Sequence, residues 1–198
     1  MVTAGSKQDK EPGRCDWCEG DPLYIRYHDE EWGVPERESL ALFERLALEG
    51  MQAGLSWRTI LAKRAHMQSV FYGFDPVRLA VAGAWDIENW LKDSGVIRHR
   101  GKLEALLANA RAMLKMQEPF GEFLWSFVGG TPIQNRWRAL SEVPSTTPAS
   151  RAMADALKRR GFRFVGPTIC YAFMQSAGLV NDHLVGCAAH ARCAALGR

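Results

Sequence analysis

The sequence predicts an all-α protein folded as one compact helical bundle. Apolar residues recur at helical spacing through most of the 198-residue chain, and the alternating patterns with Asn-Gly or Asp-Gly turns that mark β-hairpins do not occur. A chain of this length suits one domain with a buried core. The clearest helix is expected over 98–116, with an apolar stripe of Leu103, Leu106, Leu107, Ala110 and Leu114 and with Arg98, Arg100, Lys102 and Arg111 largely outside it.

The other elements follow from the same spacing and from helix-breaking residues. Residues 15–34 mix aromatic, polar and breaker residues without a sustained period, which predicts a structured loop. Asp75 followed by Pro76 is typical of an N-cap and a first helical position. The breaker-rich stretch 129–147 predicts a surface loop. Further helices are expected over 38–49, 55–71, 86–94, 120–128 and 149–160, and after the turn within 164–179.

The domain is expected to span residues 14–190, between a disordered tail at 1–13 and a flexible tail at 191–198. No apolar run approaches the ~18 residues that cross a membrane. The N-terminus has no apolar signal core, so we expect a cytoplasmic protein. We also expect a monomer with no membrane partner. The net charge of +3 does not by itself indicate a nucleic-acid partner, because the clustering of charge matters more.

The stretch 48–57 predicts a ligand pocket. The amphipathic segment before it would bring Glu49 to the inner end of a buried helix, where an unpaired carboxylate is costly to desolvate. Gly50 and Gly54 would break the helix and let the backbone approach a neighbour closely. With the indole of Trp57 nearby, the group suits a flat ligand that is cationic or forms hydrogen bonds. The alternative is a helical corner with a capping Glu and a core Trp.

Cysteine and histidine spacing predicts a structural zinc site. Five cysteines, an odd number, favour metal ligands plus core thiols over a disulfide framework. His183 and Cys187 are four residues apart, and Cys15 and His28 can complete a closed tetrahedral set. The Cys15–Cys18 pair is a rival half-site, and His190 and Cys193 are spare candidates; alternatively, all of these are core thiols and a capped histidine.

Two glycine-containing turns are candidates for binding the DNA backbone. Residues 160–168 and 93–102 each join helices through a turn flanked by Lys and Arg. Backbone N–H groups before a helix suit phosphate oxygens, and nearby basic side chains add affinity that weakens with salt. The alternative is a pair of helix corners with solvated charges. The aromatic residues Trp17, Tyr24, Tyr27, Trp32 and Trp57, with a buried acid, suit an extruded base, although each alone can be a core residue.

Five blocks of the chain, at 21–35, 48–57, 97–102, 164–175 and 178–183, resemble the bacterial 3-methyladenine DNA glycosylase I family. They occur in the same order over about 14–187. The resemblance implies a helix–hairpin–helix glycosylase fold, with its main DNA-binding hairpin around 161–168. It selects one set of zinc ligands, Cys15, His28, His183 and Cys187. Many other helix–hairpin–helix glycosylases place a catalytic Asp after the hairpin, which we align with Asn181; members of this family lack that Asp as well.

The resemblance also implies a function for each candidate residue. The enzyme would flip 3-methyladenine out of double-stranded alkylated DNA and hydrolyse its N-glycosidic bond, without a lyase step. Glu49 would recognise the cationic base, and Tyr27 and Trp57 would stack on it. Trp17, Tyr24 and Trp32 would surround this pocket. The hairpin contacts to DNA would come from Gly161, Arg163, Val165, Gly166 and Thr168.

Two other functions fit the residues. A non-catalytic DNA-binding module with structural zinc would bind DNA and release no base. A metal-dependent hydrolase would use the same Cys and His residues, but it needs an open coordination position that a closed four-ligand set does not offer. The residues do not decide between 3-methyladenine and 3-methylguanine, which differ at the edge that Glu49 would read.

Overall fold

The computed structural model describes residues 13–197, which are mostly helical as predicted. Three short 3-10 turns also occur, η1 (Asp16–Cys18), η2 (Tyr72–Phe74) and η3 (Leu140–Glu142). In chain order the helices are α1 (Pro22–Glu30), α2 (Ser39–Gln52), α3 (Trp57–Val70), α4 (Pro76–Val81), α5 (Ala84–Trp90), α6 (Arg100–Leu114), α7 (Phe120–Ser126), α8 (Pro148–Arg159), α9 (Pro167–Ser176) and α10 (Ala188–Leu196).

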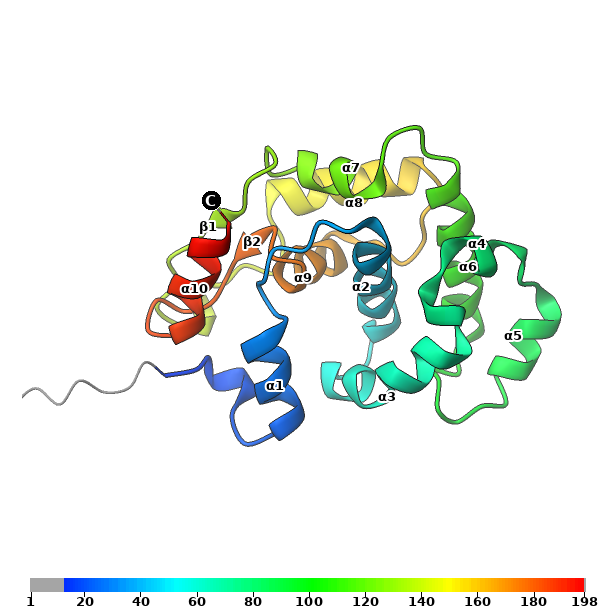
Figure 1. Ribbon diagram of the computed structural model, residues 1–198, viewed down its shortest axis with the longest axis horizontal. Helices are drawn as coiled ribbons and strands as arrows, with labels where there is room; N and C mark the ends of the chain where they lie inside the picture. The colour runs from blue at the N-terminus through cyan, green and yellow to red at the C-terminus, as the bar shows by residue number, and fades with distance from the viewer. Residues whose placement is uncertain (1–12, 198) are drawn as a thin grey trace, which may run out of the picture.

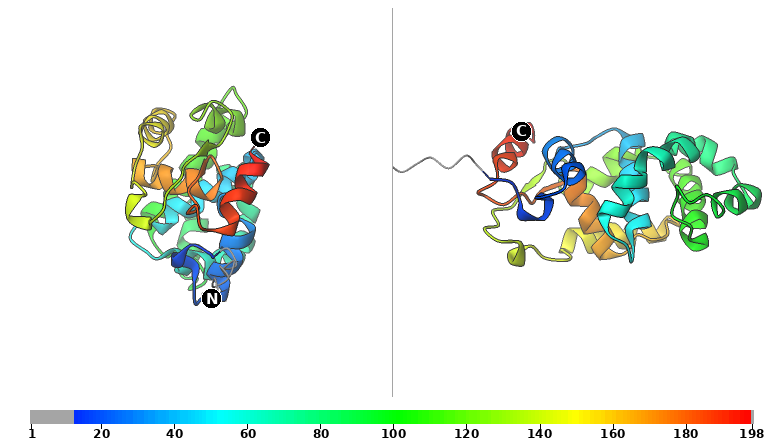
Figure 2. Two further views of the ribbon diagram at one scale, coloured as in Figure 1. Left: turned by 90° about the vertical axis from the view of Figure 1, so that its left-hand side faces the viewer. Right: turned by 90° about the horizontal axis from the view of Figure 1, so that it is seen from below.

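Helices α2 and α9 pack against each other in the middle of the molecule (Figure 1). Helices α3 to α6 form one end, and α1 and α10 lie at the other (Figures 1 and 2). The N- and C-terminal parts of the domain meet at that second end, where Gly13 pairs with Cys187 in a single β-bridge. Two strands of two residues, β1 (Ile133–Gln134) and β2 (Val180–Asn181), pair in parallel nearby.

Capping residues in the sequence explain where several helices begin. Asp75 caps α4 by accepting a hydrogen bond from the Val77 N–H, as predicted. Ser56 caps α3 in the same way, so this helix starts at Trp57 rather than at Leu55. Apolar residues of α2, α6 and α9 then form the central core, in which Leu42, Phe43, Leu46, Leu103, Leu106, Phe173 and Met174 are buried.

The loop predicted over 15–34 is wrong, because residues 22–30 form helix α1. Asp21 accepts a hydrogen bond from the Leu23 N–H, and Pro22 takes the first helical position. The helix buries Tyr27 and His28. Two adjacent residues on a helix point in different directions, so α1 shows no single apolar stripe in the sequence.

Two further predictions are not met: Lys102 is not on a solvent-facing side of its helix, and Gly50 does not end the helix that contains it. Lys102 is buried, and its ammonium donates to the carbonyl oxygens of Met51 at 2.8 Å and Ala53 at 2.6 Å, at the end of α2. Those carbonyls have no partner within the helix, which explains why a lysine is buried there. Gly50 does not break α2, which continues to Gln52. A Cβ at Gly50 would lie 3.2 Å from the Phe164 carbonyl oxygen, so the close approach predicted there is confirmed.

The flexible tail predicted at 191–198 is wrong for the part that the structure describes. Helix α10 extends to Leu196 and buries Cys193. At the other end, residues 1–12 of the predicted tail lie outside the described residues, and Gly13 takes part in the bridge to Cys187.

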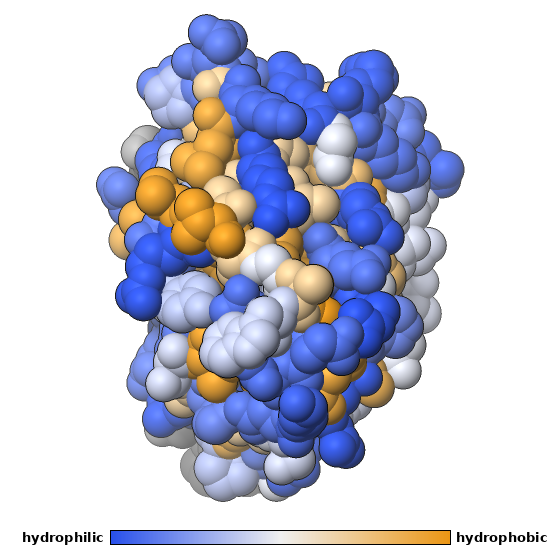
Figure 3. Space-filling model, turned by 90° about the vertical axis from the view of Figure 1, so that its right-hand side faces the viewer, coloured by the Kyte–Doolittle hydropathy of each residue, from blue (hydrophilic) through white to orange (hydrophobic). Residues whose placement is uncertain are grey.

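The surface of the α3–α6 end is largely hydrophilic, with a small apolar area (Figure 3). Val77, Val81 and Trp85 are the exposed large apolar residues of α4 and α5. Within residues 13–197, no helix combines the length and the apolar character that crossing a membrane requires.

Candidate metal centre and base-binding cavity

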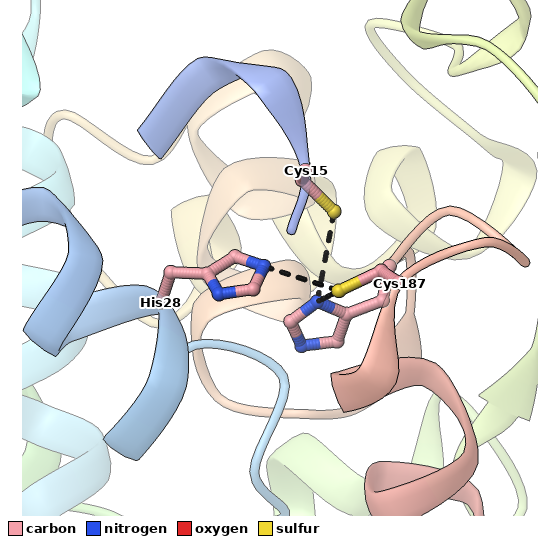
Figure 4. Close-up of side chains that lie close together, drawn as sticks. Cys15, His28 and Cys187 are labelled. Carbon is pink, nitrogen blue, oxygen red and sulfur yellow. Dashed lines mark hydrogen bonds between the residues drawn. The ribbon is translucent and has the colours of Figure 1, made fainter. Parts of the chain in front are cut away.

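The structure brings Cys15, His28, His183 and Cys187 together where the N- and C-terminal parts of the described chain meet. Figure 4 shows three of them, Cys15, His28 and Cys187. All four are buried, and their ligand atoms lie within 4.8 Å of one another. The Cys187 Sγ lies 3.5 Å from His28 Nε2 and 3.7 Å from His183 Nδ1, and the Cys15 Sγ lies 3.8 Å from His183 Nδ1. Cys15 precedes η1, His28 comes from α1, and the other two residues flank the turn before α10.

These separations fit a tetrahedral zinc ion. With Zn–S near 2.3 Å and Zn–N near 2.05 Å, a tetrahedron gives a sulfur–nitrogen separation of about 3.6 Å. The second ring nitrogen of each histidine is also engaged: His28 Nδ1 donates to Asp29 at 2.8 Å, and His183 Nε2 donates to the Trp32 carbonyl oxygen at 2.9 Å. Such contacts fix the ring orientation of metal-binding histidines. The four residues therefore form a closed set that can hold a metal ion.

One thiol of the cluster, that of Cys187, is biased toward its ionised form. The Cys15 hydrogen bond, followed by those from His183 and His28, lowers the pKa of the Cys187 thiol, although burial opposes this shift. Burial also lowers the pKa of His28, but the hydrogen bonds to Cys187 and Asp29 outweigh it and raise the pKa overall. A thiolate in a buried site is the form that binds metal.

The rival ligands lie outside this set. The Cys18 Sγ donates to the Cys15 carbonyl oxygen at 3.1 Å, and burial raises its pKa to about 11. His190 Nε2 is 2.8 Å from the Asn135 carbonyl oxygen. Cys193 is a buried residue of α10. None of these three belongs to the four-residue cluster.

A cavity of about 250 Å³ lies beside the cluster, and all the predicted pocket residues line it. Glu49 and Gln52 come from α2, and Trp57 begins α3. The loop predicted over 129–147 contributes Leu140 and Val143. The complete lining is Trp17, Tyr24, Tyr27, Trp32, Glu49, Gln52, Trp57, Leu140, Val143, Ala172, Gln175 and Asp182.

Glu49 is the unusual acid of this cavity. Its side chain is 4% exposed, and burial raises its pKa to about 8, a rise that the neighbouring Ser176 hydroxyl only partly offsets. The burial predicted from the sequence is confirmed. Burial, and secondarily the charge of Glu49, raises the pKa of Tyr27 well above its usual value. The indole N–H of Trp57 is buried and has no partner within residues 13–197.

Aromatic rings connect the cavity to the cluster of Cys15, His28, His183 and Cys187. The Trp32 ring centroid lies 4.6 Å from that of His183, and the Trp17 centroid lies 5.4 Å from that of His28. Tyr27 packs on Trp57 with a centroid separation of 5.4 Å. Tyr24 contacts Trp17 at 5.6 Å, and its hydroxyl accepts from the Arg58 N–H at 3.0 Å. One wall of the cavity therefore rests on the histidines of the cluster.

Sequence reasoning missed Asp182 and Gln175. Asn181, which we aligned with the catalytic Asp of other glycosylases, does not line the cavity; its amide donates to Gln134 and to the His190 carbonyl oxygen. The acid in the cavity wall is the next residue, Asp182, which is 2% exposed. Asn181 ends β2 and Asp182 directly follows it. Successive residues of extended chain point to opposite sides, so a shift of one position changes the side chain that faces the cavity.

Of the five residues predicted to bind DNA, Gly161, Arg163, Val165 and Gly166 lie in the turn between α8 and α9, and Thr168 lies in the first turn of α9. Gly161 and Phe164 have φ of +91° and +54°. Gly166 is the N-cap residue of α9, and no side chain caps the start of this helix. Asn109 of α6 holds the turn, accepting from the Arg163 N–H at 2.7 Å and donating to the Arg163 carbonyl oxygen at 3.1 Å. Gly161, Arg163 and Thr168 are exposed, whereas Val165 is buried and can offer only its backbone.

The second candidate turn, at 93–102, is held by side chains of α3. His66 Nε2 lies 2.8 Å from Asp93 Oδ2, and the Lys63 ammonium contacts the Ser94 carbonyl oxygen. Arg98 and His99 are exposed. Arg100 pairs with Glu88 at 2.6 Å, and Lys102 is buried, so neither is free to bind a phosphate in this arrangement.

Comparisons with known proteins identify the family. Residues 17–190 match the methyladenine glycosylase family model. The chain is 56% identical to DNA-3-methyladenine glycosylase 1 of Escherichia coli (strain K12), over 88% of this chain and 95% of that protein. A crystal structure of 3-methyladenine DNA glycosylase I matches with a TM-score of 0.89 and 55% identity, covering 90% of this chain and 100% of that one.

A variant of 3-methyladenine DNA glycosylase I, solved in complex with 3-methyladenine, matches with a TM-score of 0.87 and 37% identity, over 89% of this chain and 97% of that one. High identity and near-complete coverage agree with the order of the blocks in the sequence. The chain therefore belongs to the 3-methyladenine DNA glycosylase I family and is a DNA glycosylase.

Proposed function

We propose that the enzyme excises 3-methyladenine from double-stranded DNA by hydrolysing the N-glycosidic bond. The single observation that carries this proposal is Glu49, a buried carboxyl group in an aromatic cavity, with its pKa raised to about 8. A neutral base gives this group no reason to ionise. A base made cationic by methylation supplies the missing countercharge, so the cavity prefers it over normal bases.

The aromatic rings add to this preference. Tyr27 and Trp57 stack on the flipped base, and a cation over an aromatic face gains roughly 0.5–2 kcal/mol. A cationic purine is also a good leaving group, so the reaction needs little acid catalysis. No lysine lines the cavity among residues 13–197, which supports hydrolysis without a lyase step, since that step needs an amine nucleophile.

The proposed metal is one zinc ion held by Cys15, His28, His183 and Cys187. Two thiolates and two imidazoles leave no open position, so zinc would supply structural stability rather than activate water. This closed set argues against the metal-dependent hydrolase. Through Trp17 and Trp32, the cluster would hold one wall of the cavity in place.

The proposed DNA contact is a helix–hairpin–helix formed by α8, the turn and α9, used by a monomer. The backbone N–H groups of Val165, Gly166 and Thr168 would bind phosphate oxygens, with Arg163 adding charge. The Phe164 carbonyl oxygen lies next to Gly50, so the turn sits against the helix that carries Glu49. This contact supports one continuous surface that binds the DNA backbone and, beside it, the flipped base.

The test is release of free 3-methyladenine from methylated duplex DNA by the wild type and by Glu49→Gln. The wild type is expected to release the base, and Glu49→Gln to release far less while still binding DNA. Glu122→Gln is the matched control, because Glu122 is exposed on α7, away from the cavity. Binding without base release by the wild type would contradict the proposal and favour the non-catalytic DNA-binding module.

A further inference from the structure

Asp182 has an unusually complete set of hydrogen-bond donors. Its Oδ1 accepts from Asn135 Nδ2 at 2.6 Å and from Trp137 Nε1 at 2.8 Å. Its Oδ2 accepts from the Tyr171 hydroxyl at 2.6 Å and from Gln175 Nε2 at 2.8 Å. Four donors on one buried carboxylate hold its position.

This arrangement fixes the amide of Gln175. The nitrogen must face Asp182, because turning the amide over would place two acceptor oxygens against each other. The Gln175 carbonyl oxygen Oε1 therefore points away from Asp182. Among residues 13–197, no group donates a hydrogen bond to it. It is also not one of the fully buried polar atoms that have no partner. Since Gln175 lines the cavity, this oxygen is available to a bound base.

Gln175 and Glu49 line the same cavity from α9 and α2, two helices that pack against each other. Both side chains can therefore contact a purine bound in this cavity. They differ in one property: a carboxyl group can donate when protonated and accept when ionised, whereas the locked amide presents only an acceptor at Oε1.

We propose that Gln175, locked by Asp182, is the residue that makes the cavity select 3-methyladenine over 3-methylguanine. Its Oε1 accepts a hydrogen bond from the exocyclic amine of adenine, and it faces the exocyclic oxygen of guanine, an acceptor, with no proton between them. An acceptor left unpaired in a buried site discriminates by roughly 10- to 100-fold. Gln175 is a specificity residue and Asp182 its positioning residue. The inference rests on the proposed glycosylase activity.

The test compares kcat/KM for release of 3-methyladenine and 3-methylguanine from methylated duplex DNA. Gln175→Met removes the acceptor while keeping the side-chain length, so the ratio of the two values is expected to fall about 10- to 100-fold. Gln68→Met is the matched control. Gln68 also donates its amide to a carboxylate at 2.8 Å, that of Glu44, but it does not line the cavity, and the ratio is expected to stay unchanged.

Asp182→Asn provides a second, independent variant. It keeps Gln175 but removes the lock, so the amide can turn over and donate to guanine, and 3-methylguanine release is expected to rise relative to 3-methyladenine. Bound metal and thermal midpoint identify variants that do not fold, since Asp182 precedes His183. An unchanged ratio in the folded variants would overturn the inference while leaving the glycosylase function intact. Failure of the wild type to release any base would overturn both.

Discussion

The Glu49 carboxyl group is buried where α2 meets α9, and its ordinary acidity is suppressed by that burial. Within the residues that face it, no basic group contributes to its pKa. A fixed basic partner would have neutralised the carboxylate in the empty cavity and removed the advantage of a cationic base. In the proposed function, the charge of the base is therefore recognised by a group that is itself uncharged at neutral pH until the base binds.

Glu49 also predicts how stability depends on pH. Its pKa rises from 4.5 in the unfolded chain to about 8 in the folded protein, so between these values the folded state holds an additional proton. Wild-type stability therefore falls, relative to Glu49→Gln, as the pH rises from 4.5 to 8, by at most about 1.4 kcal/mol per pH unit. Urea unfolding of both proteins at several pH values measures this difference. A difference that stays constant across this range would contradict the buried-acid account.

The one-residue error in aligning Asn181, where Asp182 lines the cavity, illustrates what the sequence can predict at the residue scale. The Val-Asn-Asp-His block shows that a polar residue follows an apolar one, but it does not show which of Asn181 and Asp182 faces the cavity. The two-residue pairing of β2 with β1 decides that orientation, and β1 lies 47 positions earlier in the chain. Likewise, the lock on Gln175 depends on Asn135 and Trp137, in a loop without a regular pattern.

At the scale of elements, helices with one apolar stripe are the ones that the sequence predicts well. Helix α6 buries Leu103, Leu106 and Leu107, and α2 begins within one residue of its expected start. Helix α1 was missed because it serves two sites instead of one core: Tyr27 lines the cavity, and His28 belongs to the metal cluster. Lys102 was misassigned because its partners are backbone carbonyls of another helix, which leave no trace in spacing.

The α8–α9 turn predicts a difference between two arginines three residues apart. Arg163 is exposed on the turn, with Glu104 only at 3.9 Å, whereas Arg160 pairs with Glu118 at 2.8 Å and lies over the Phe123 ring. Arg163→Ala is expected to weaken duplex binding and to lower the slope of log K against log salt by about 1. Arg160→Ala should leave that slope unchanged. Binding titrations at several salt concentrations measure both, and equal slopes for the two variants would exclude the turn as the phosphate contact.

At the scale of the whole molecule, the cluster proposed to bind zinc joins parts of the chain that are far apart in sequence. Cys15 and Cys187 are 172 positions apart, yet both belong to one buried group with His28 and His183. Spacing alone left several ligand sets possible, and the family resemblance selected the one that the structure assembles. Closing so long a loop restricts the unfolded chain strongly, which is the physical reason to expect a large effect on stability.

Loss of the metal should affect both folding and the cavity. Cys187→Ser is expected to bind less zinc, to unfold at a lower temperature and to change tryptophan fluorescence, because Trp17 and Trp32 pack on the cluster histidines. Cys193→Ser is the matched control, a buried thiol outside the cluster. Metal analysis and thermal unfolding of both variants measure the effect. Full zinc content in Cys187→Ser would show that these four residues are not the ligands.

The measurement that tests the central claim most directly is the pH profile of kcat/KM for 3-methyladenine release, for the wild type and Glu49→Gln. This parameter reports the ionisation of the free enzyme. If an ionised Glu49 recognises the cationic base, wild-type kcat/KM rises with pH and levels off near the Glu49 pKa of about 8, whereas the Glu49→Gln profile is low and flat there. Equal profiles for the two proteins would contradict recognition of the base charge by Glu49.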